Sequence, residues 1–379
     1  MSKKNIKAIE DLVSSPAYTD PVAAYVATME ALNAPPDHKS ATTQQWDKLY
    51  EVAQNIFVAE PWKYLYNNDR IALLLPGRDE PVYIVVMGNG GMTYGIGIYP
   101  GYVALAGINK MEESLGNTSV MFEQHCINLY YGDREELEAS DRKVIKELGL
   151  KFRGKNCWPY FRSMLPGFVP WTLNYDEAEL AITALQNFFM AFRAYGQEAM
   201  EVDFENGETL LRFYDPETAM WCNAPVKMPP APIIQPKLFF SDDELILQLK
   251  KKKKSTTQLG LSISHIPAPV QENKNERPRI PIVALLVDTK SGMIINQAMD
   301  TDARNVSASA VDMLIEYIIR YGRPASIAVS DELSANCVED FTAKVGIKLT
   351  EGKASQAMEL LMKAMGGMDM DFLDDEEWS

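Results

Sequence analysis

The chain has 379 residues and a formal net charge of −15, and 46% of its residues are hydrophobic. This length predicts two or three domains, and the hydrophobic fraction excludes a disordered protein, which is poor in apolar residues. The net charge argues against tight nucleic-acid binding as the main task, because a negative field repels a polyanion unless basic residues gather locally.

Cysteine and histidine content excludes several kinds of site. The three histidines are His38, His125 and His265, and no cysteines form a C-x-x-C pair. This pattern is unlike a disulfide framework, a zinc site with paired ligands or a His-rich metal centre. We interpret His125 and Cys126 as part of a half-buried strand, because strand neighbours point to opposite faces and rarely act as base and nucleophile. The cysteines are Cys126, Cys157, Cys222 and Cys337.

The N-terminus and the hydropathy pattern indicate where the chain works. The opening MSKKNIKAIEDLVSS lacks the apolar h-region of a secretory signal. No stretch approaches the roughly 18–20 apolar residues that a membrane-spanning helix needs. We therefore expect a cytoplasmic protein with no membrane contact.

Residues 1–40 are predicted to form an N-terminal helical appendage, in which a helix starts at Asp20 and Pro21. Residues 41–228 follow as an α+β domain with a mixed or antiparallel sheet. Its first helix runs to Pro61, and its strands are RIALLL, YIVVMG, YGIGIY, VMFEQHCINLYYG, LLRFYD and MWCNAPV. Asn89-Gly90 predicts a type I′ hairpin turn. Two capping boxes predict further helix starts, Asp133 with Glu136 and Asp176 with Glu179.

Residues 229–254 are predicted to be a proline-rich linker with a helix that Ser241 and Glu244 cap and that ends in five lysines, Lys250–Lys254. Residues 255–366 form a second domain in the order β-β-β-α-β-α-β-α. Its strands are LGLSISHI, IVALLVD, MIINQAM, ASIAVSD and IKLTE, and its last helix is SQAMELLMKAMGG. Residues 367–379 are an acidic tail.

The glycine-rich run from Gly88 to Gly101 is not a phosphate-binding motif. The dinucleotide fingerprint needs glycine at position 93, which is Thr93, and the P-loop needs a G-K-[ST] that is absent. No helix is expected to open there. Glycine alternates with Ile96 and Ile98, which predicts a strand that packs closely against the aromatic residues of its own domain.

Several segments resemble known families. The helix WDKLYEVA followed by EPW, the strand YGIGIYPG, and KFRGKNCWPYFR with PGFVPW resemble one uncharacterised bacterial domain. PIVALLVDTKSGMII and YGRPASIAVSD resemble a second domain that often follows it. Both are domains of unknown function, so the resemblance implies a bacterial tandem pair over residues 43–366 and no reaction or ligand.

Residues 151–171 reverse the local charge and form the best candidate binding segment. They hold four basic residues, no acidic residue and six aromatic residues. Basic groups between aromatic rings suit a single-stranded nucleic acid or an anionic peptide, so Arg153, Lys155, Trp158 and Arg162 are the predicted contact residues. The alternative is an ordered loop whose rings fill the edge of the core and whose cations pair with the acidic helix at 133–147.

The second domain also resembles the ribonuclease H-like and integrase-type cores, in which paired carboxylates hold two divalent ions. Asp288 ends one strand and Asp331 follows another, and Glu351 or Glu359 would supply a third acid. The resemblance would imply Mg²⁺ or Mn²⁺, whereas otherwise no cofactor is expected. Two features argue against it, because Asp288 lies on the second strand instead of the first and no D-N-G follows Asp331. An aspartate at such junctions also caps backbone N–H groups.

The lysine run and the acidic tail have opposite charges. Each has a simple interpretation, as a solvated helix end and as a disordered segment. Six acidic residues opposite five lysines could also attract one another or neighbouring chains, with Phe372, Leu373 and Trp378 as apolar anchors.

These patterns predict a non-enzymatic binding or interaction protein that uses residues 151–171, with a protein or a single-stranded nucleic acid as partner. A metal-dependent nuclease-like or phosphoryl-transfer enzyme with Asp288 and Asp331, or a degenerate form of it, is the alternative.

Overall fold

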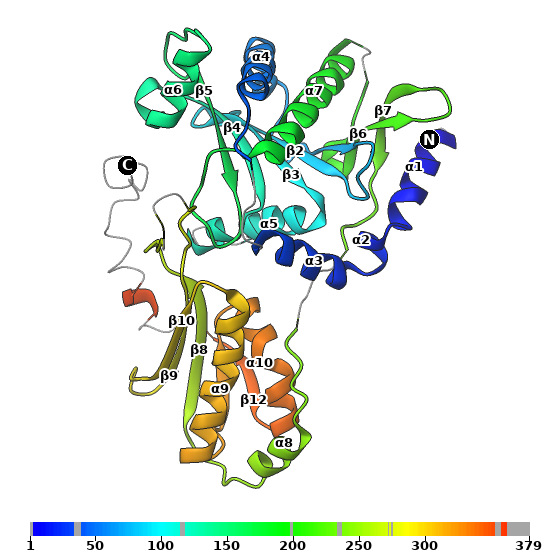
Figure 1. The fold of residues 1–379 in the computed structure, drawn as a ribbon. Coiled ribbons are helices and arrows are strands. Elements are labelled where there is room, and N and C mark those ends of the chain that lie inside the picture. The colour runs from blue at the N-terminus through cyan, green and yellow to red at the C-terminus, as the bar shows by residue number, and fades with distance from the viewer. Residues whose placement is uncertain are drawn as a thin grey trace. The chain divides into compact units, whose positions relative to one another are not determined.

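The computed structural model describes residues 3–33, 39–113, 118–197, 200–232, 237–271, 273, 276–352 and 358–361. Its contacts divide these residues into two units, 3–166 with 170–232, and 167–169 with 237–361. Each unit combines its own sheet with helices, as Figure 1 shows, so the α+β class expected from the sequence is confirmed. His38, the tail at 367–379 and most of the last predicted helix lie outside the described residues.

Within the described residues, the first unit is built on a seven-stranded sheet in the order β5-β4-β3-β2-β1-β6-β7. β1 and β6 are parallel, and the other neighbours are antiparallel. The strands are β1 (Ile71–Leu74), β2 (Val82–Met87), β3 (Tyr94–Pro100), β4 (Cys126–Gly132), β5 (Trp158–Met164), β6 (Glu208–Asp215) and β7 (Met220–Lys227).

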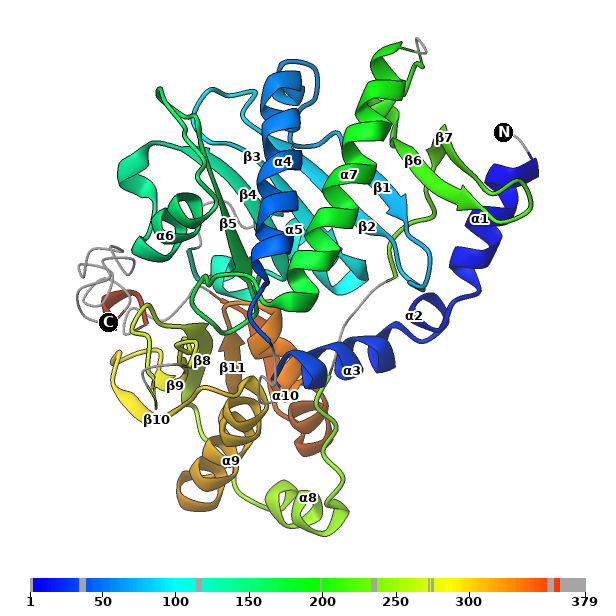
Figure 2. The same ribbon diagram turned by 45° about the horizontal axis from the view of Figure 1, so that its top comes forward.

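Two long helices cover one face of this sheet. α4 (Thr43–Ala59) and α7 (Tyr175–Gln197) lie side by side there (Figure 2), and their apolar stripes form the largest core with Ile84 and Ile96. Thr42 and Gln45 form a capping box that starts α4. The predicted box of Asp176 with Glu179 is wrong, because Asn174 and Glu177 exchange the two capping bonds and the Glu179 carboxylate accepts from the Gln45 side chain.

A second core lies on the opposite face, under α1 (Lys3–Val13), α2 (Pro16–Thr19), α3 (Pro21–Asn33) and α5 (Gly101–Glu113). No sequence pattern predicted α5. Gly101 has a φ of 81°, and the Glu80 carboxylate accepts a bond of 2.7 Å from the Tyr102 amide. A residue distant in sequence therefore supplies the acceptor that a helix start requires.

Short helices replace parts of the predicted elements. They are η1 (Pro61–Lys63), η2 (Thr118–Glu123), η3 (Arg134–Glu136), η4 (Phe204–Asn206) and α6 (Ala139–Glu147). The strand expected from residue 120 begins only at Cys126, after η2. The Asp133 box closes only the single turn η3, and a second box, Glu138 with Asp141, starts α6.

The loop between β2 and β3 is not a type I′ turn. That turn requires positive φ at Asn89 and Gly90, whereas the positive values occur at Gly88 and Gly91. The Gly91 amide donates to the Gly88 carbonyl. A Cβ on Gly97 would lie 2.6 Å from the Tyr99 ring, which agrees with the interpretation of close aromatic packing.

Within the described residues, the second unit is built on a five-stranded sheet in the order β10-β9-β8-β11-β12. β8, β9 and β10 are antiparallel, and β11 and β12 run parallel to β8. The strands are β8 (Gln258–His265), β9 (Ile282–Asp288), β10 (Ile294–Asp300), β11 (Ser326–Val329) and β12 (Lys348–Glu351).

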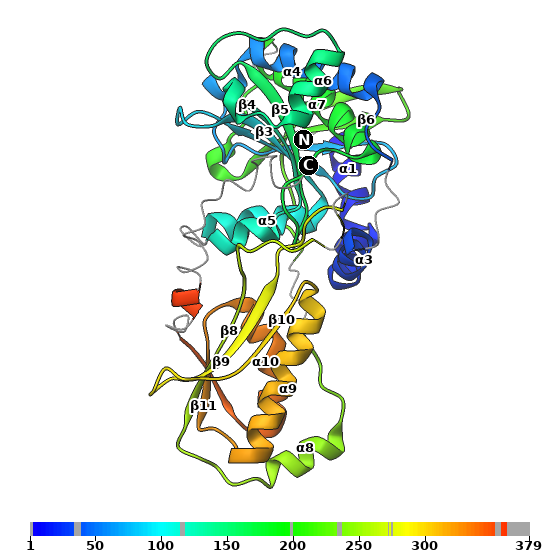
Figure 3. The same ribbon diagram turned by 60° about the vertical axis from the view of Figure 1, so that its left-hand side comes forward.

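Two helices cover one face of the second sheet, α9 (Ala303–Tyr321) and α10 (Glu332–Val345), and α8 (Asp243–Lys250) packs against both of them. Figure 3 shows α9 and α10 on the same side of this sheet. Ile246 and Leu249 of α8 are buried in this core, so the helix that ends in lysine packs in the second unit. Asp242, rather than Ser241, caps α8.

The short segment Gly167–Val169 also belongs to the second unit, where the centre of the Phe168 ring lies 4.5 Å from the Arg279 guanidinium.

Candidate functional site

The segment at 151–171 contains a strand as well as loops. β5 (Trp158–Met164) pairs with β4 along its whole length and forms one edge of the first sheet. Phe161 is completely buried in the main core, and the Phe152 and Trp158 rings meet edge to face at 5.7 Å at its border. These rings contribute to packing, as the ordered-loop alternative predicted for the aromatic residues.

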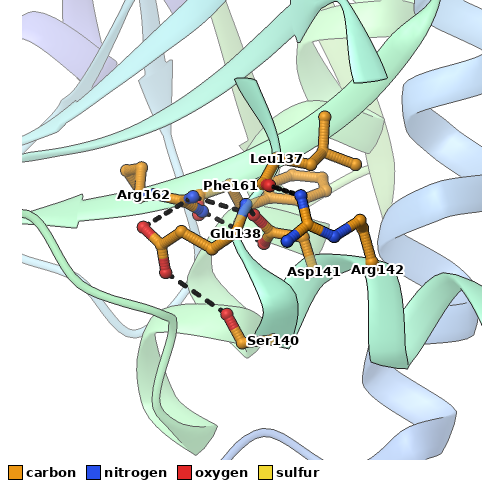
Figure 4. A network of polar contacts seen from close by, with 7 residues as sticks. All are labelled: Leu137, Glu138, Ser140, Asp141, Arg142, Phe161 and Arg162. Atoms are coloured by element: carbon orange, nitrogen blue, oxygen red, sulfur yellow. Dashed lines mark hydrogen bonds and ion pairs between the residues drawn. The ribbon is translucent and has the colours of Figure 1, made fainter. Parts of the chain in front are cut away.

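Arg162 is an interior residue. Its guanidinium donates two hydrogen bonds, of 3.0 and 2.8 Å, to the Asp141 carboxylate. The Arg162 Nη2 atom also lies 2.7 Å from a Glu138 carboxylate oxygen (Figure 4). The side chain is only 4% exposed. Although burial opposes the charge of Arg162, the two carboxylates raise its pKa. We predicted Arg162 as a contact residue, and the structure instead places it in a buried ion pair that joins β5 to the start of α6.

The remaining basic residues of the segment are exposed. Lys151, Arg153 and Lys155 occupy the turn before β5, and none of them forms an ion pair with a described residue. The turn has a defined conformation, since Gly154 and Asn156 have φ values of 105° and 54°. We call Lys151, Arg153 and Lys155 the β5 cation cluster.

Asp133 orders this turn. Its Oδ1 atom accepts a bond of 2.7 Å from the Asn156 amide, and the same residue caps η3. The cations therefore lie on a backbone that is held in place before any ligand arrives, which lowers the entropy cost of binding. Trp158 is half-buried at the end of the turn.

The two candidate catalytic aspartates have local structural roles. The Asp288 Oδ1 atom accepts bonds from the amides of Lys290 and Ser291, and these bonds lower its pKa. Asp331 caps α10 by accepting a bond of 2.7 Å from the Ser334 amide. Both interactions satisfy backbone N–H groups at a turn and a helix start.

The strand register separates these aspartates. Asp288 is opposite Leu259 near the beginning of β8, whereas Ser334 of the Asp331 cap bonds to the Ile263 amide. Four residues of strand correspond to about 13 Å, and a two-metal site holds its ions about 4 Å apart. Glu351 pairs with Val329, at the Asp331 end. Among the described residues no cluster of three His, Cys, Asp or Glu side chains could hold a metal ion.

The sequence pattern identified the lysine run but not the other basic residues that the tertiary structure places beside it, at the end of the second sheet where β8, β11 and β12 begin. The Arg323 amide bonds to the Lys253 carbonyl, and Lys254 pairs with Arg323 in an isolated bridge. Only adjacency in the folded sheet brings these residues together. We call this surface the cationic pole and define it by Lys250–Lys254, Arg320, Arg323 and Lys348.

These observations define a protein of two α+β units with exposed basic surfaces. Residues 46–212 match the family model described as Domain of unknown function (DUF7309), and residues 245–366 match Domain of unknown function (DUF6930). The chain therefore carries two adjacent domains of unknown function in tandem, which confirms the resemblance drawn from its motifs. No curated protein matches the chain. Among the described helices, none is long and apolar enough to cross a bilayer.

Proposed function

We propose that this is a non-enzymatic interaction protein of the bacterial cytoplasm, and that the β5 cation cluster binds an acidic segment of a partner protein. The observation that carries the proposal is the exposure of Lys151, Arg153 and Lys155 on a turn that Asp133 already orders. Three cations without described ion-pair partners provide charge-assisted contacts for carboxylates.

The aromatic packing favours a polypeptide over a single-stranded nucleic acid. Base stacking requires ring faces that are open to solvent, whereas Phe152, Trp158 and Phe161 pack on or in the core. An acidic peptide needs only the exposed cations and the backbone groups beside them.

The second unit supports a binding role as well. Its sheet order, with three antiparallel strands followed by two parallel ones, supports the resemblance to ribonuclease H-like folds. The first strand of such a fold would carry the metal-binding carboxylate, but β8 reads QLGLSISH and contains none. The wide separation of Asp288 from Asp331 adds to this argument. We therefore favour a degenerate form of that fold, retained for binding.

Binding of a fluorescent acidic dodecapeptide tests the proposal. Fluorescence anisotropy at low salt should show at least a tenfold weaker affinity when Lys151, Arg153 and Lys155 are all replaced by glutamine. The matched control replaces Lys48, Lys143 and Lys146, which are exposed lysines on α4 and α6, and should retain the affinity. Both variants change the net charge equally, so a difference between them reports position.

A labelled oligothymidylate serves as the second probe. If this probe binds tightly through the same three residues and the peptide does not bind, the ligand of the β5 cation cluster is a single-stranded nucleic acid instead of a protein segment. Equal losses in the two variants would refute the β5 cation cluster as a site.

A further inference from the structure

The cationic pole concentrates positive charge in a strongly acidic chain. Five consecutive lysines begin at the last residue of α8, Lys250, and continue to Lys254. Arg320 lies in the last turn of α9, and Lys348 is the first residue of β12. Figure 1 shows that the α8–β8 connection and the C-terminal end of α9 lie at the same end of the second unit. The Arg323 side chain joins them, since it donates to the carbonyls of Lys252 and Val345.

These charges have no carboxylate partners among the described residues. Lys250–Lys254, Arg320 and Lys348 are exposed, and no cation of the pole forms an ion pair with any described residue. The carbonyl ends of α8 and α9 offset part of the charge, but a helix dipole is equivalent to only about half an elementary charge. The cationic pole is therefore an electrostatic site suited to a flexible polyanion.

The C-terminal segment of the same chain has matching chemistry. Residues 369–377 contain six acidic residues and no basic one, together with Phe372 and Leu373, and Trp378 follows. The cationic pole likewise presents apolar side chains, because Ile319 and Tyr321 of α9 are 50% and 63% exposed. Charge and apolar groups thus occur together on both partners.

Chain length permits this contact within one molecule. The last described residues, Met358 and Leu361, pack with Ile266, which directly follows β8. β8 begins near the cationic pole, and its eight residues span about 26 Å. Residues 362–369, fully extended, reach at most about 28 Å, which is enough to cover the length of β8. The aromatic anchors Phe372 and Trp378 lie further along the chain. The linkage also keeps the tail at a high effective concentration.

We propose that the cationic pole is the docking site of the acidic tail, residues 369–379, of the same chain. Docking neutralises the charge of the lysine run. Another polyanion can then bind this surface only if it displaces the tail. The inference is independent of the β5 cation cluster, because it uses a different surface and a different ligand.

Carbodiimide cross-linking of the full-length protein tests the contact directly. The reagent joins a carboxylate to a lysine amine, and mass spectrometry should find links from residues 369–377 to Lys250–Lys254. An equal mixture of ¹⁴N- and ¹⁵N-labelled protein should give cross-linked peptides of uniform isotope content. Links of mixed content would assign the tail to a second copy, and links to other lysines alone would reject the site; either result overturns the proposal.

Heparin chromatography provides a second readout, because heparin competes for the same charges. Deletion of residues 369–379 should raise the salt concentration at which the protein elutes, and so should replacement of the six tail acids by their amides. Replacing Lys251–Lys254 by glutamine should abolish this shift, whereas replacing Lys48, Lys143 and Lys146 should preserve it. Equal elution of the wild type and the deletion variant would contradict tail docking.

Discussion

The role assigned to Arg162 changes once the residues around it are known. It lies in a basic, aromatic sequence that is typical of a binding surface, yet two carboxylates from the start of the preceding helix, α6, surround its guanidinium (Figure 4). Breaking a buried ion pair is costly because the remaining charge stays desolvated. Arg162 therefore has an internal role in the first unit, and the proposed binding surface is limited to its exposed neighbours Lys151, Arg153 and Lys155.

We expect Asp141→Asn to lower the free energy of unfolding of the first unit by about 3 kcal/mol, because the buried Arg162 charge loses its bidentate partner. Tryptophan fluorescence during urea denaturation measures this, since Trp46, Trp62, Trp158, Trp171 and Trp221 all belong to that unit. Glu135→Gln, at an exposed position nearby, is the control and should change little. A similar small effect for both variants would show that the buried pair contributes little.

At the level of elements, α1 contacts the first sheet through ion pairs and one buried leucine, and Lys7 pairs with Glu217 at 3.2 Å. The Lys4 ammonium lies 2.5 Å from Asp215 at the end of β6, and Leu12 is buried in the core on that face. The bonds from Lys4 and Thr218 lower the pKa of Asp215 to about 2. Because this value lies below the ordinary carboxyl pKa of about 4, the interaction favours the folded state whenever Asp215 is ionised.

The pH dependence of α1 docking follows from that shift. The stabilisation should be complete above pH of about 4 and should be lost as the pH falls through about 2, where Asp215 becomes protonated in the folded state. Asp215→Asn should therefore be less stable than the wild type at pH 6, and the difference should shrink steadily as the pH falls from about 4 through about 2, as measured by urea midpoints from tryptophan fluorescence. A constant difference across this range would mean that Asp215 acts through packing rather than charge.

Across the second unit as a whole, strand direction determines which charged residues lie at the same end of the sheet. β9 runs antiparallel to β8 and β11 runs parallel to it, so Asp288 and Asp331 follow strands that end at opposite ends of the sheet. The same directions gather Lys250–Lys254, Arg323 and Lys348 at the end where β8 begins.

Asp331→Ala should lower the stability of the second unit by about 1 kcal/mol, the usual effect of losing a helix N-cap. Calorimetric melts with and without millimolar Mn²⁺ should show the same loss and no metal-dependent rise in the wild type. A ligand at 100 times its dissociation constant adds about 2.7 kcal/mol, so a bound ion would be visible. A rise that disappears in Asp331→Ala would restore the metal-dependent alternative.

Local sequence patterns predicted most of the helices and strands and the location of the charged segments. Hydrophobic periodicity identified α4, α7, α9 and the strands of both sheets except β5, which we interpreted as part of a loop, because amphipathic patterns reflect local geometry. It did not predict α5, whose start depends on Glu80 from another part of the chain, and it assigned the capping role to Asp176 instead of Asn174.

Which charged residues are exposed, and which of them lie close together, depends on the folded arrangement. Arg162 is buried and therefore does not belong to the candidate surface. The strand register places Asp288 far from Asp331. Pairing between strands places Arg323 and Lys348 beside the lysine run. The physical reason is that burial, ion pairing and distance between residues far apart in sequence depend on how strands pair. A local pattern contains no information about that pairing.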